Sequence, residues 1–478
     1  MKNNQSSGAA GLQSRGSPRG KESVRGRSPG RGRRRAWTLA GAAWLAFTIG
    51  PRALCQSAKP APSPHVPSLL DPVNRRLPKW LRFSGEFRDR AEGRTAFNFA
   101  PGSGDGYDLT RFRLNVETRP KSWLRFFVQG QDAQAPGIDS VNLNSMLKDN
   151  FDLRQGYAEF DAGPQSHVQF RVGRQELNFG AQRLVGSFDW GNTSRSYDAA
   201  RLTLAWSRAS VDVFASSPVN ILMTSPDKRQ PGVNLYGIYG SLADGSRRTT
   251  LQPYIFWKTN PLVTSEDGKP GDEDLFTLGF RWIGTWPAHF DTEMEMARQA
   301  GSYSNDSIAA WAGYWIGGYT LADLPLAPRL SVEYDYATGN RRPGDGEVNT
   351  FDQLYPTNHA YYGITDQVGW RNMRALRMGT DFSPHRKIKA NFDYYFFWLA
   401  SPFDGLYNAG GALVVKAPPG GALHTDVGQE VDIFLSYAFA PELSFGAGFG
   451  HLFPGRFLQE NSPGSGTSFP YVFATYRF

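Results

Sequence analysis

The stretch that decides the fold is Val168 to Leu202, VQFRVGRQELNFGAQRLVGSFDWGNTSRSYDAARL. It opens with an alternating run in which Val168, Phe170 and Val172 share one face and polar residues or glycine lie between them. It closes with a second alternating run, which ends at Leu202. A period of two is typical of a β-strand. One apolar face and one charged face predict a sheet that separates lipid from water.

The same alternation recurs from Trp80 to the last residue, and no helical period is sustained there. The composition agrees with many short strands and turns, since aromatic residues make up 14% and the chain holds 52 Gly and 32 Pro. Each alternating segment is near the roughly 9–11 residues of a tilted membrane strand. We predict eighteen strands, at 80–92, 107–119, 123–132, 151–160, 166–176, 197–206, 209–216, 234–241, 250–258, 274–284, 287–299, 309–319, 328–338, 371–382, 388–398, 426–438, 441–451 and 469–478.

The connections between these segments alternate in length. Short ones such as 119–122 and 383–387 are followed by long ones such as 339–370 and 400–425. Bacterial outer-membrane barrels combine short periplasmic turns with long extracellular loops. The last segment, SFPYVFATYRF, ends on an aromatic residue and resembles the targeting strand of such barrels. We therefore predict an all-β fold, a transmembrane antiparallel β-barrel of 18 strands with long extracellular loops and short periplasmic turns.

The residues before the barrel divide into two segments. Residues 1–58 predict a signal peptide with an extended basic n-region, because basic residues precede the short apolar run Ala36–Gly50. Residues 59–79 predict a Pro-rich, extended periplasmic linker, and residues 80–478 predict the barrel. The net charge of +8 is concentrated in the signal, so the mature chain is nearly neutral and no nucleic-acid partner is expected. Cys55 is the only cysteine, so no disulfide is expected.

Charged side chains on the faces opposite the apolar ones are expected to line the lumen, because lone charges are costly in hydrocarbon. Their signs separate by region. The first three strands carry mostly arginines, among them Arg88, Arg111, Arg113 and Arg125. The eleventh to sixteenth strands carry mostly acids. Two interpretations stay open: opposed walls set a field across a pore that draws in anionic solutes, or the charges pair with one another and hold the wall together.

The motif residues are similar to those of the alginate-export family of outer-membrane barrels. The resemblance rests on Arg171–Leu177, Arg183–Gly186, Asp189-Trp190 and Ser196–Leu202, with Leu153–Phe160 as the strand before them. It implies a monomeric eighteen-stranded channel in the bacterial outer membrane, whose arginine-lined constriction passes an anionic polysaccharide. By this resemblance and the wall charges, the expected pore-lining residues are Arg171, Arg174, Glu176, Arg183, Asp189, Arg195, Asp198, Arg201, Arg111, Arg113 and Arg125.

The favoured function is thus a passive channel that exports an anionic exopolysaccharide, with outer-membrane lipid and periplasmic export proteins as further partners. The alternative is a general diffusion porin for small solutes. An enzyme is not expected, because the chain lacks G-x-S-x-G, P-loop and H-E-x-x-H motifs. No cofactor or metal is expected either: the acidic segment Ser265–Asp274 could hold Ca²⁺ but lacks an EF-hand spacing.

Overall fold

The computed structural model describes residues 68–162 and 167–478, and the described residues of the predicted barrel form a closed antiparallel barrel of 18 strands. The predicted signal and most of the predicted linker lie outside the described residues. The end of that linker contains a short helix, α1 (Asp71–Asn74), rather than a continuous extended chain. The Asn74 side chain exchanges two hydrogen bonds with the backbone of Phe83, which attaches this helix to the barrel wall. None of the helices in 68–162 and 167–478 is long and apolar enough to cross a membrane.

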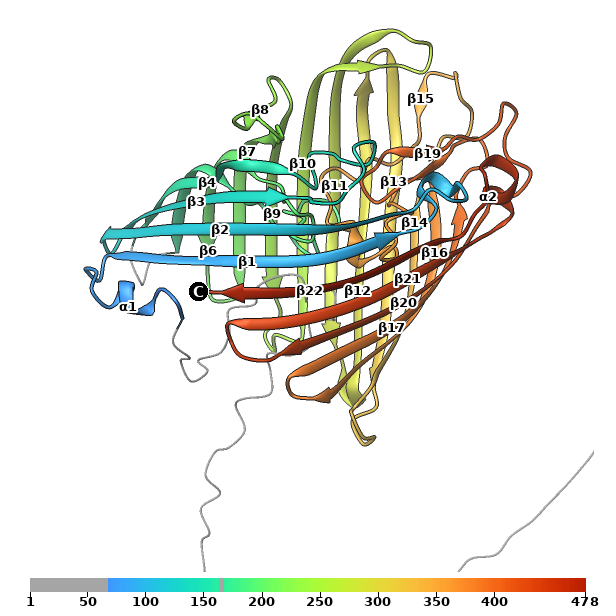
Figure 1. Cartoon of the computed structure of the whole chain (residues 1–478). Coiled ribbons are helices and arrows are strands. Elements are labelled where there is room, and N and C mark those ends of the chain that lie inside the picture. The colour runs from blue at the N-terminus through green and yellow to red at the C-terminus, as the bar shows by residue number, and fades with distance from the viewer. Residues whose placement is uncertain (1–67, 163–166) are drawn as a thin grey trace, which may run out of the picture. The chain divides into compact units, whose positions relative to one another are not determined.

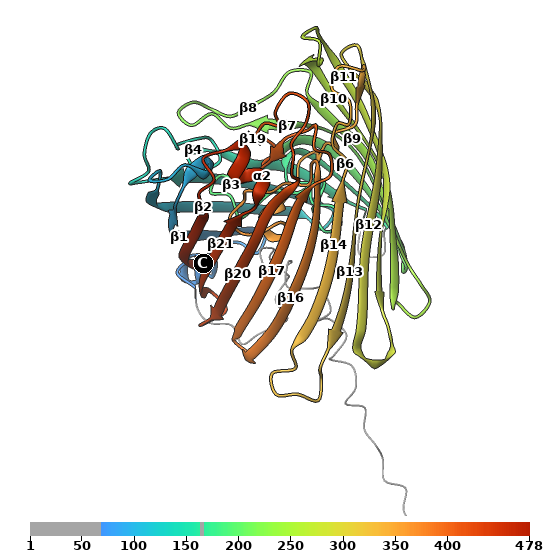
Figure 2. The ribbon, with the colours of Figure 1, turned by 90° about the vertical axis from the view of Figure 1, so that its right-hand side faces the viewer.

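Every predicted strand has an observed counterpart, and successive strands run side by side around the barrel (Figures 1 and 2). Because period-two alternation is a local property of the chain, it locates strands well but marks their ends only approximately. The barrel strands are β1 (Leu81–Arg94), β2 (Asp105–Lys121), β3 (Leu124–Gln134), β4 (Asp149–Asp161), β5 (Val168–Gln175), β6 (Tyr197–Ala205), β7 (Ala209–Asn220), β9 (Asn234–Ala243), β10 (Thr249–Thr264), β11 (Pro270–Thr285), β12 (Phe290–Tyr303), β13 (Asp306–Thr320), β14 (Arg329–Ala337), β16 (Met373–His385), β17 (Ile388–Leu399), β20 (Asp426–Ala438), β21 (Leu443–Pro454) and β22 (Thr467–Arg477).

Small elements decorate the long connections. The outer loops carry the short strands β8 (Lys228–Arg229), β15 (Glu347–Val348), β18 (Leu406–Tyr407) and β19 (Leu413–Val415), the helix α2 (Arg456–Asn461) and two 3-10 turns, η2 (Phe97–Phe99) and η4 (Asn358–Ala360). A third 3-10 turn, η3 (Pro287–His289), lies in the short connection between β11 and β12.

The barrel closes where the first strand meets the last. β1 pairs with β22 from Glu86↔Arg477 to Glu92↔Tyr471. The terminal Phe478 extends this ladder, because Gly85 N–H donates to its carbonyl at 2.7 Å and its own N–H donates back at 3.0 Å. Its ring lies where a side chain at position 85 would be: a Cβ there would stand 2.5 Å from the ring. Glycine at position 85 therefore allows the terminal aromatic residue to seal the barrel.

The two faces of the wall differ as the alternation predicts. On β1 the Phe87 side chain is 44% exposed on the outside, whereas the next residue, Arg88, is 6% exposed on the lumen side. The same contrast holds on β2 between Phe112, at 37%, and Arg111, at 1%. An outward apolar face and an inward polar face are what a lipid-embedded barrel requires.

The strict alternation of long and short connections is not observed. The β10–β11 and β12–β13 connections lie on the extracellular side, yet they are tight turns at 265–269 and 304–305. Their strands continue pairing beyond the apolar band, for example at Tyr303↔Asp306. Backbone hydrogen bonds between strands need no apolar side chains. Polar residues whose pattern predicts a loop can therefore extend a strand into water. The long extracellular loops are those at 176–196, 338–372 and 400–425.

Candidate pore lining and the loops that fill it

Two extracellular loops fold back into the lumen. We call them the first inner loop, residues 176–196, and the second inner loop, residues 338–372. Phe179 of the first inner loop stacks on aromatic side chains of the lumen wall, with ring centroids 5.0 Å from Phe214 and 5.1 Å from Tyr239. In the second inner loop, Phe351, Tyr362 and Trp370 are almost completely buried. Where the inner loops lie, the lumen therefore contains packed apolar side chains rather than an open aqueous space.

The two inner loops are joined to each other. Val185 and Tyr355 form a parallel β-bridge. Tyr355 N–H donates to the Leu184 carbonyl at 2.8 Å, and Gly186 N–H donates to the Tyr355 carbonyl at 2.9 Å. Arg195 strengthens the junction, because its guanidinium donates to the carbonyls of both Gly186 and Tyr355. The inner loops thus form one hydrogen-bonded plug.

The first inner loop places an acidic residue against the arginines of β1 and β2. The Asp189 carboxylate accepts hydrogen bonds from Arg113, at 2.7 Å, and from Arg111, at 3.4 Å. Arg88 and Arg90 donate to backbone carbonyls of the same segment, both of them to Trp190. Burial alone would raise the pKa of the Asp189 carboxyl, but the guanidiniums of Arg111 and Arg113 hold this pKa well below its ordinary value. One carboxylate and several carbonyls of this loop therefore accept hydrogen bonds from the basic wall, and Glu86 and Glu92 of β1 pair with Arg111 and Arg90.

The same loop places a cation against the acidic wall. Arg183 is completely buried and pairs with Glu333 and Asp335 of β14, with 2.8 Å to Asp335. Its guanidinium also lies 3.7 Å from the ring centroid of Tyr314 and donates to the Tyr362 hydroxyl at 2.8 Å. The first inner loop therefore spans the lumen with one charge for each wall, and each charge has the sign opposite to that wall.

The second inner loop is held by two carboxylates of β20. Thr365 donates to Glu430 from its N–H, at 2.9 Å, and from its hydroxyl, at 2.7 Å. Ile364 N–H donates to Asp432 at 3.0 Å. The acids that sequence reasoning assigned to one wall are therefore engaged largely with loop and wall partners, which matches the pairing interpretation at these positions.

A second set of arginines stays accessible. Arg125 on β3, Arg171 on β5 and Arg201 on β6 lie in one transverse row, because Arg125 is the register partner of Glu159, Glu159 of Arg171, and Arg171 of Arg201. Their side chains are 20%, 21% and 23% exposed, whereas that of Arg111 is 1% exposed. We call these three residues the arginine row.

Each arginine of the row has a carboxylate partner on the wall. Arg125 pairs with Glu117 at 2.8 Å and Arg201 with Asp212 at 2.8 Å. Arg171 donates from Nε to Glu159 at 2.8 Å and lies 4.5 Å from the ring centroid of Tyr157. The row is thus a hydrated, largely neutralised strip of guanidiniums on the lumen wall.

Two of the expected pore-lining residues lie on the outward face of the wall and not on the lumen face. Arg174 and Asp198 share the face of Phe170 and Val172, which points outward, and they pair with each other at 2.9 Å. Arg174 also donates to the carbonyls of Leu153 and Asp227. The family resemblance assigns all charged residues of the motif to the pore, but in a strand with a period of two the even and odd positions lie on opposite faces. These two residues brace the extracellular edge rather than the lumen.

The remaining predicted residues face the inside but are engaged in structure. Glu176 pairs with Arg154, and Asp189, Arg183 and Arg195 belong to the plug. Glu159 was missed, although alternation on the strand before the motif places it beside Arg171. Tyr355 and Tyr362 were missed as well, and no local pattern identifies them, because their contacts come from segments far away in the chain.

The acidic segment Ser265–Asp274 consists of a tight turn at 265–269 and the start of β11. Within it the Asp267 carboxylate is paired with Lys269 at 2.5 Å, and the Glu266 carboxylate accepts hydrogen bonds from the second inner loop. No group of three or more His, Cys, Asp or Glu side chains suited to a metal ion occurs in 68–162 and 167–478.

The comparisons with known proteins agree with this geometry. Crystal structures of three Pseudomonas aeruginosa proteins are similar to this chain. OpdO is 12% identical, with a TM-score of 0.57, and the match covers 85% of this chain and 99% of OpdO. OpdK with vanillate is 8% identical and OccK8 (OprE) is 12% identical, with TM-scores of 0.56 and 0.55, and each match covers 83% of this chain and 98% of the other protein. At such identities they show the shared fold alone. No curated protein gives a significant match.

The family comparison covers almost the whole barrel. The family model described as alginate export matches residues 79–472. Together with the barrel fold, this match places the chain in the bacterial outer membrane. The chain belongs to the alginate export family of outer-membrane barrels.

Proposed function

We propose that this protein is a passive outer-membrane channel that exports an anionic exopolysaccharide, with carboxylated sugars as the substrate class. The observation that carries the proposal is the arginine row. Guanidinium groups engage carboxylates through two parallel hydrogen bonds, which suits them to a uronate polymer. Membership of the alginate export family supports export, rather than uptake, as the direction of transport.

Transport along the row proceeds by exchange of partners. Each guanidinium already pairs with Glu117, Glu159 or Asp212, so a sugar carboxylate competes with a wall carboxylate for the same guanidinium. Ion pairs that stay in contact with water contribute about 0–1 kcal/mol each, and about a fifth of each arginine side chain in the row is exposed. Weak, replaceable contacts let a polymer slide, whereas the deeply buried arginines would hold it fast. The driving force comes from polymer synthesis behind the channel.

The plug has to move before a polymer passes. The inner loops fold into the lumen and their hydrogen bonds connect opposite walls, so we infer that this arrangement is a closed state. The proposed partners are the anionic polysaccharide, outer-membrane lipid and periplasmic export proteins that deliver the polymer. A monomer is proposed as the working unit, since one chain closes the barrel by itself and the pore needs no second chain to complete its wall.

Single-channel recording tests the proposal. An oligouronate added to the periplasmic side should block the current transiently, whereas a neutral dextran of equal length should not. In the triple variant Arg125→Gln, Arg171→Gln, Arg201→Gln, the residence time of the oligouronate should fall about tenfold, since three exposed pairs amount to roughly 1.5 kcal/mol. Arg208→Gln, in the turn after β6, is the matched control. An unchanged residence time in the triple variant, or cation preference in the unaltered protein, contradicts the proposal.

The alternative is a diffusion porin for small anionic or zwitterionic solutes. It is favoured by the fold shared with the Opd and Occ barrels, one of which was crystallised with vanillate. The porin and exporter hypotheses differ in one property that can be measured, the steady conductance. A porin conducts small ions steadily in a planar bilayer with its inner loops in place, whereas an exporter conducts only when the plug is displaced.

A further inference from the structure

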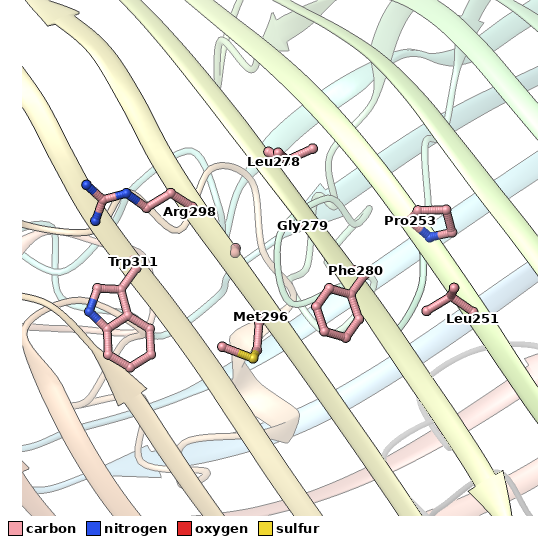
Figure 3. Close-up of a pocket in the computed structure, with 9 residues that line it drawn as sticks. Leu251, Pro253, Leu278, Gly279, Phe280, Met296, Arg298 and Trp311 are labelled. Atoms are coloured by element: carbon pink, nitrogen blue, oxygen red, sulfur yellow. The ribbon is translucent and has the colours of Figure 1, made fainter.

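The outer wall carries a groove on its lipid-facing side (Figure 3). The groove has a volume of about 740 Å³ and is lined by side chains of β10, β11, β12 and β13, with Leu278 63% exposed and Met296 37% exposed. Its lining is almost entirely apolar. The one charged residue at its edge is Arg298, whose guanidinium lies on the side of its strand that faces Trp311 (Figure 3).

Local sequence explains the hollow. Pro253 of β10 has no N–H, so it cannot donate to β9, and the pairing of these strands skips Gln252 and Pro253 without a change of register. Its neighbour across the strands is Gly240, where an added Cβ would lie 3.2 Å from the Pro253 ring. Gly279 contributes only its backbone to the lining, because a Cβ there would point inward and lie 2.6 Å from the Tyr254 ring. The groove thus lies beside Pro253 and Gly240, which face each other on neighbouring strands.

Arg298 is placed unusually for a cation. It occupies an outward position on β12, opposite Leu278 on one side and Trp311 on the other. No ion pair or hydrogen bond engages its side chain within 68–162 and 167–478. By contrast, Arg174 on β5, which also points outward, is paired with Asp198. A cation at the lipid face without a protein partner calls for an anion supplied by the membrane.

The level of Arg298 identifies the leaflet. It lies in the extracellular half of β12, beside aromatic residues that occupy the extracellular ends of their strands: Trp311 stacks on Tyr336, with ring centroids 4.5 Å apart. Aromatic belts mark the membrane–water interface. Arg374, at the extracellular end of β16, is the register partner of Tyr336 and adds a second cation to this belt. The two arginines are separated by three strand spacings, roughly 14 Å.

We propose that this groove is a binding site for the phosphorylated glycolipid of the outer leaflet, lipid A. Arg298 holds a headgroup phosphate, with Arg374 as a second contact, and the acyl chains fill the groove over Pro253, Phe280 and Met296. The proposal goes beyond the transport function, because every residue in it faces away from the lumen.

Native mass spectrometry of the mature protein in detergent tests the site. The probes are lipid A, its dephosphorylated form and phosphatidylglycerol. Lipid A should bind more tightly than either of the other two. Arg298→Gln should weaken lipid A binding about tenfold and Arg374→Gln should weaken it less, while Arg298→Lys should retain part of the affinity. Arg386→Gln, an exposed arginine in the periplasmic β16–β17 turn, is the control and should bind as the unaltered protein does.

Three results would overturn the proposal. They are equal binding of lipid A by Arg298→Gln, equal binding of the dephosphorylated form, and phosphatidylglycerol binding as tight as that of lipid A. Gel mobility without boiling shows whether each variant has closed its barrel. Conductance recorded on the same preparations reports on the pore separately, so failure of the lipid site and failure of the proposed transport function are distinguishable.

Discussion

Individual residues in this protein take opposite roles according to burial. Arg183 and Arg171 belong to one sequence motif, yet the first is completely buried between Glu333 and Asp335 while the second keeps a fifth of its surface exposed to the lumen. A buried charge with fixed partners stabilises one arrangement, and an exposed one can exchange partners. Residue identity alone does not separate these roles.

Removing the buried cation should destabilise the plug. Arg183→Met takes a partner from Glu333 and Asp335 in a completely buried site, and breaking such a pair costs about 3–5 kcal/mol. Urea unfolding in lipid should show this loss, and the double variant with Glu333→Gln should recover part of it. A loss under about 1 kcal/mol in the single variant would contradict the buried pair.

Acid should loosen the same loop at its other end. The arginines hold the pKa of Asp189 below its ordinary value, so its ionised form stabilises the closed plug. That contribution is complete above a pH of about 4, near the unfolded pKa, and is lost as the pH falls through the lower folded value. The difference in channel-opening frequency between the unaltered protein and Asp189→Asn should therefore be constant from pH 8 to about 4 and shrink below it. Asp189→Asn should open more often above a pH of about 4; a difference that keeps its full size at lower pH would assign the effect to another group.

At the scale of elements, β5, the first inner loop and β6 form one functional unit. The strands contribute two members of the arginine row to the wall, and the loop between them contributes half of the plug. The second inner loop, between β14 and β16, completes the plug through the Val185↔Tyr355 bridge. Opening therefore requires that two loops move together or separate.

A disulfide across the bridge tests this coupling. Neighbouring strands lie about 4.8 Å apart, within reach of a disulfide, and Cys55, the one native cysteine, falls in the predicted signal. Val185→Cys with Tyr355→Cys should hold the channel closed under oxidising conditions and release it when a reductant is added. Each single variant should show no response to the reductant. Full conductance in the oxidised double variant would mean that the loops do not separate during opening.

At the scale of the whole molecule, closure depends on the contact between the ends of the barrel. Gly85 accommodates the Phe478 ring, so Gly85→Val should prevent the terminal residue from completing the β1–β22 ladder. The fraction of protein that migrates as a folded barrel in unboiled gels should fall severalfold. Gly106→Ala is the control, because a Cβ there meets nothing within 4 Å. Equal folded fractions for both variants would show that Phe478 is dispensable for closure.

The sequence by itself determined the strands, their two faces, the number around the barrel and the sign of charge on each wall. These are consequences of a period of two, and each strand displays that period without reference to the rest of the chain. The same rule places Arg174 and Asp198 on the outward face, and only the family resemblance assigned them to the pore. The accessible row of Arg125, Arg171 and Arg201 was contained in the predicted set but could not be separated from its buried members.

Only the tertiary structure decided where the long loops go. The bridge between Val185 and Tyr355 and the pairing of Arg183 with Glu333 join segments that no local pattern connects. They exist because a closed cylinder brings opposite walls within reach of one loop. Buried charges are costly to leave unpaired, and a loop carrying Arg183 and Asp189 contributes one counter-charge to each wall.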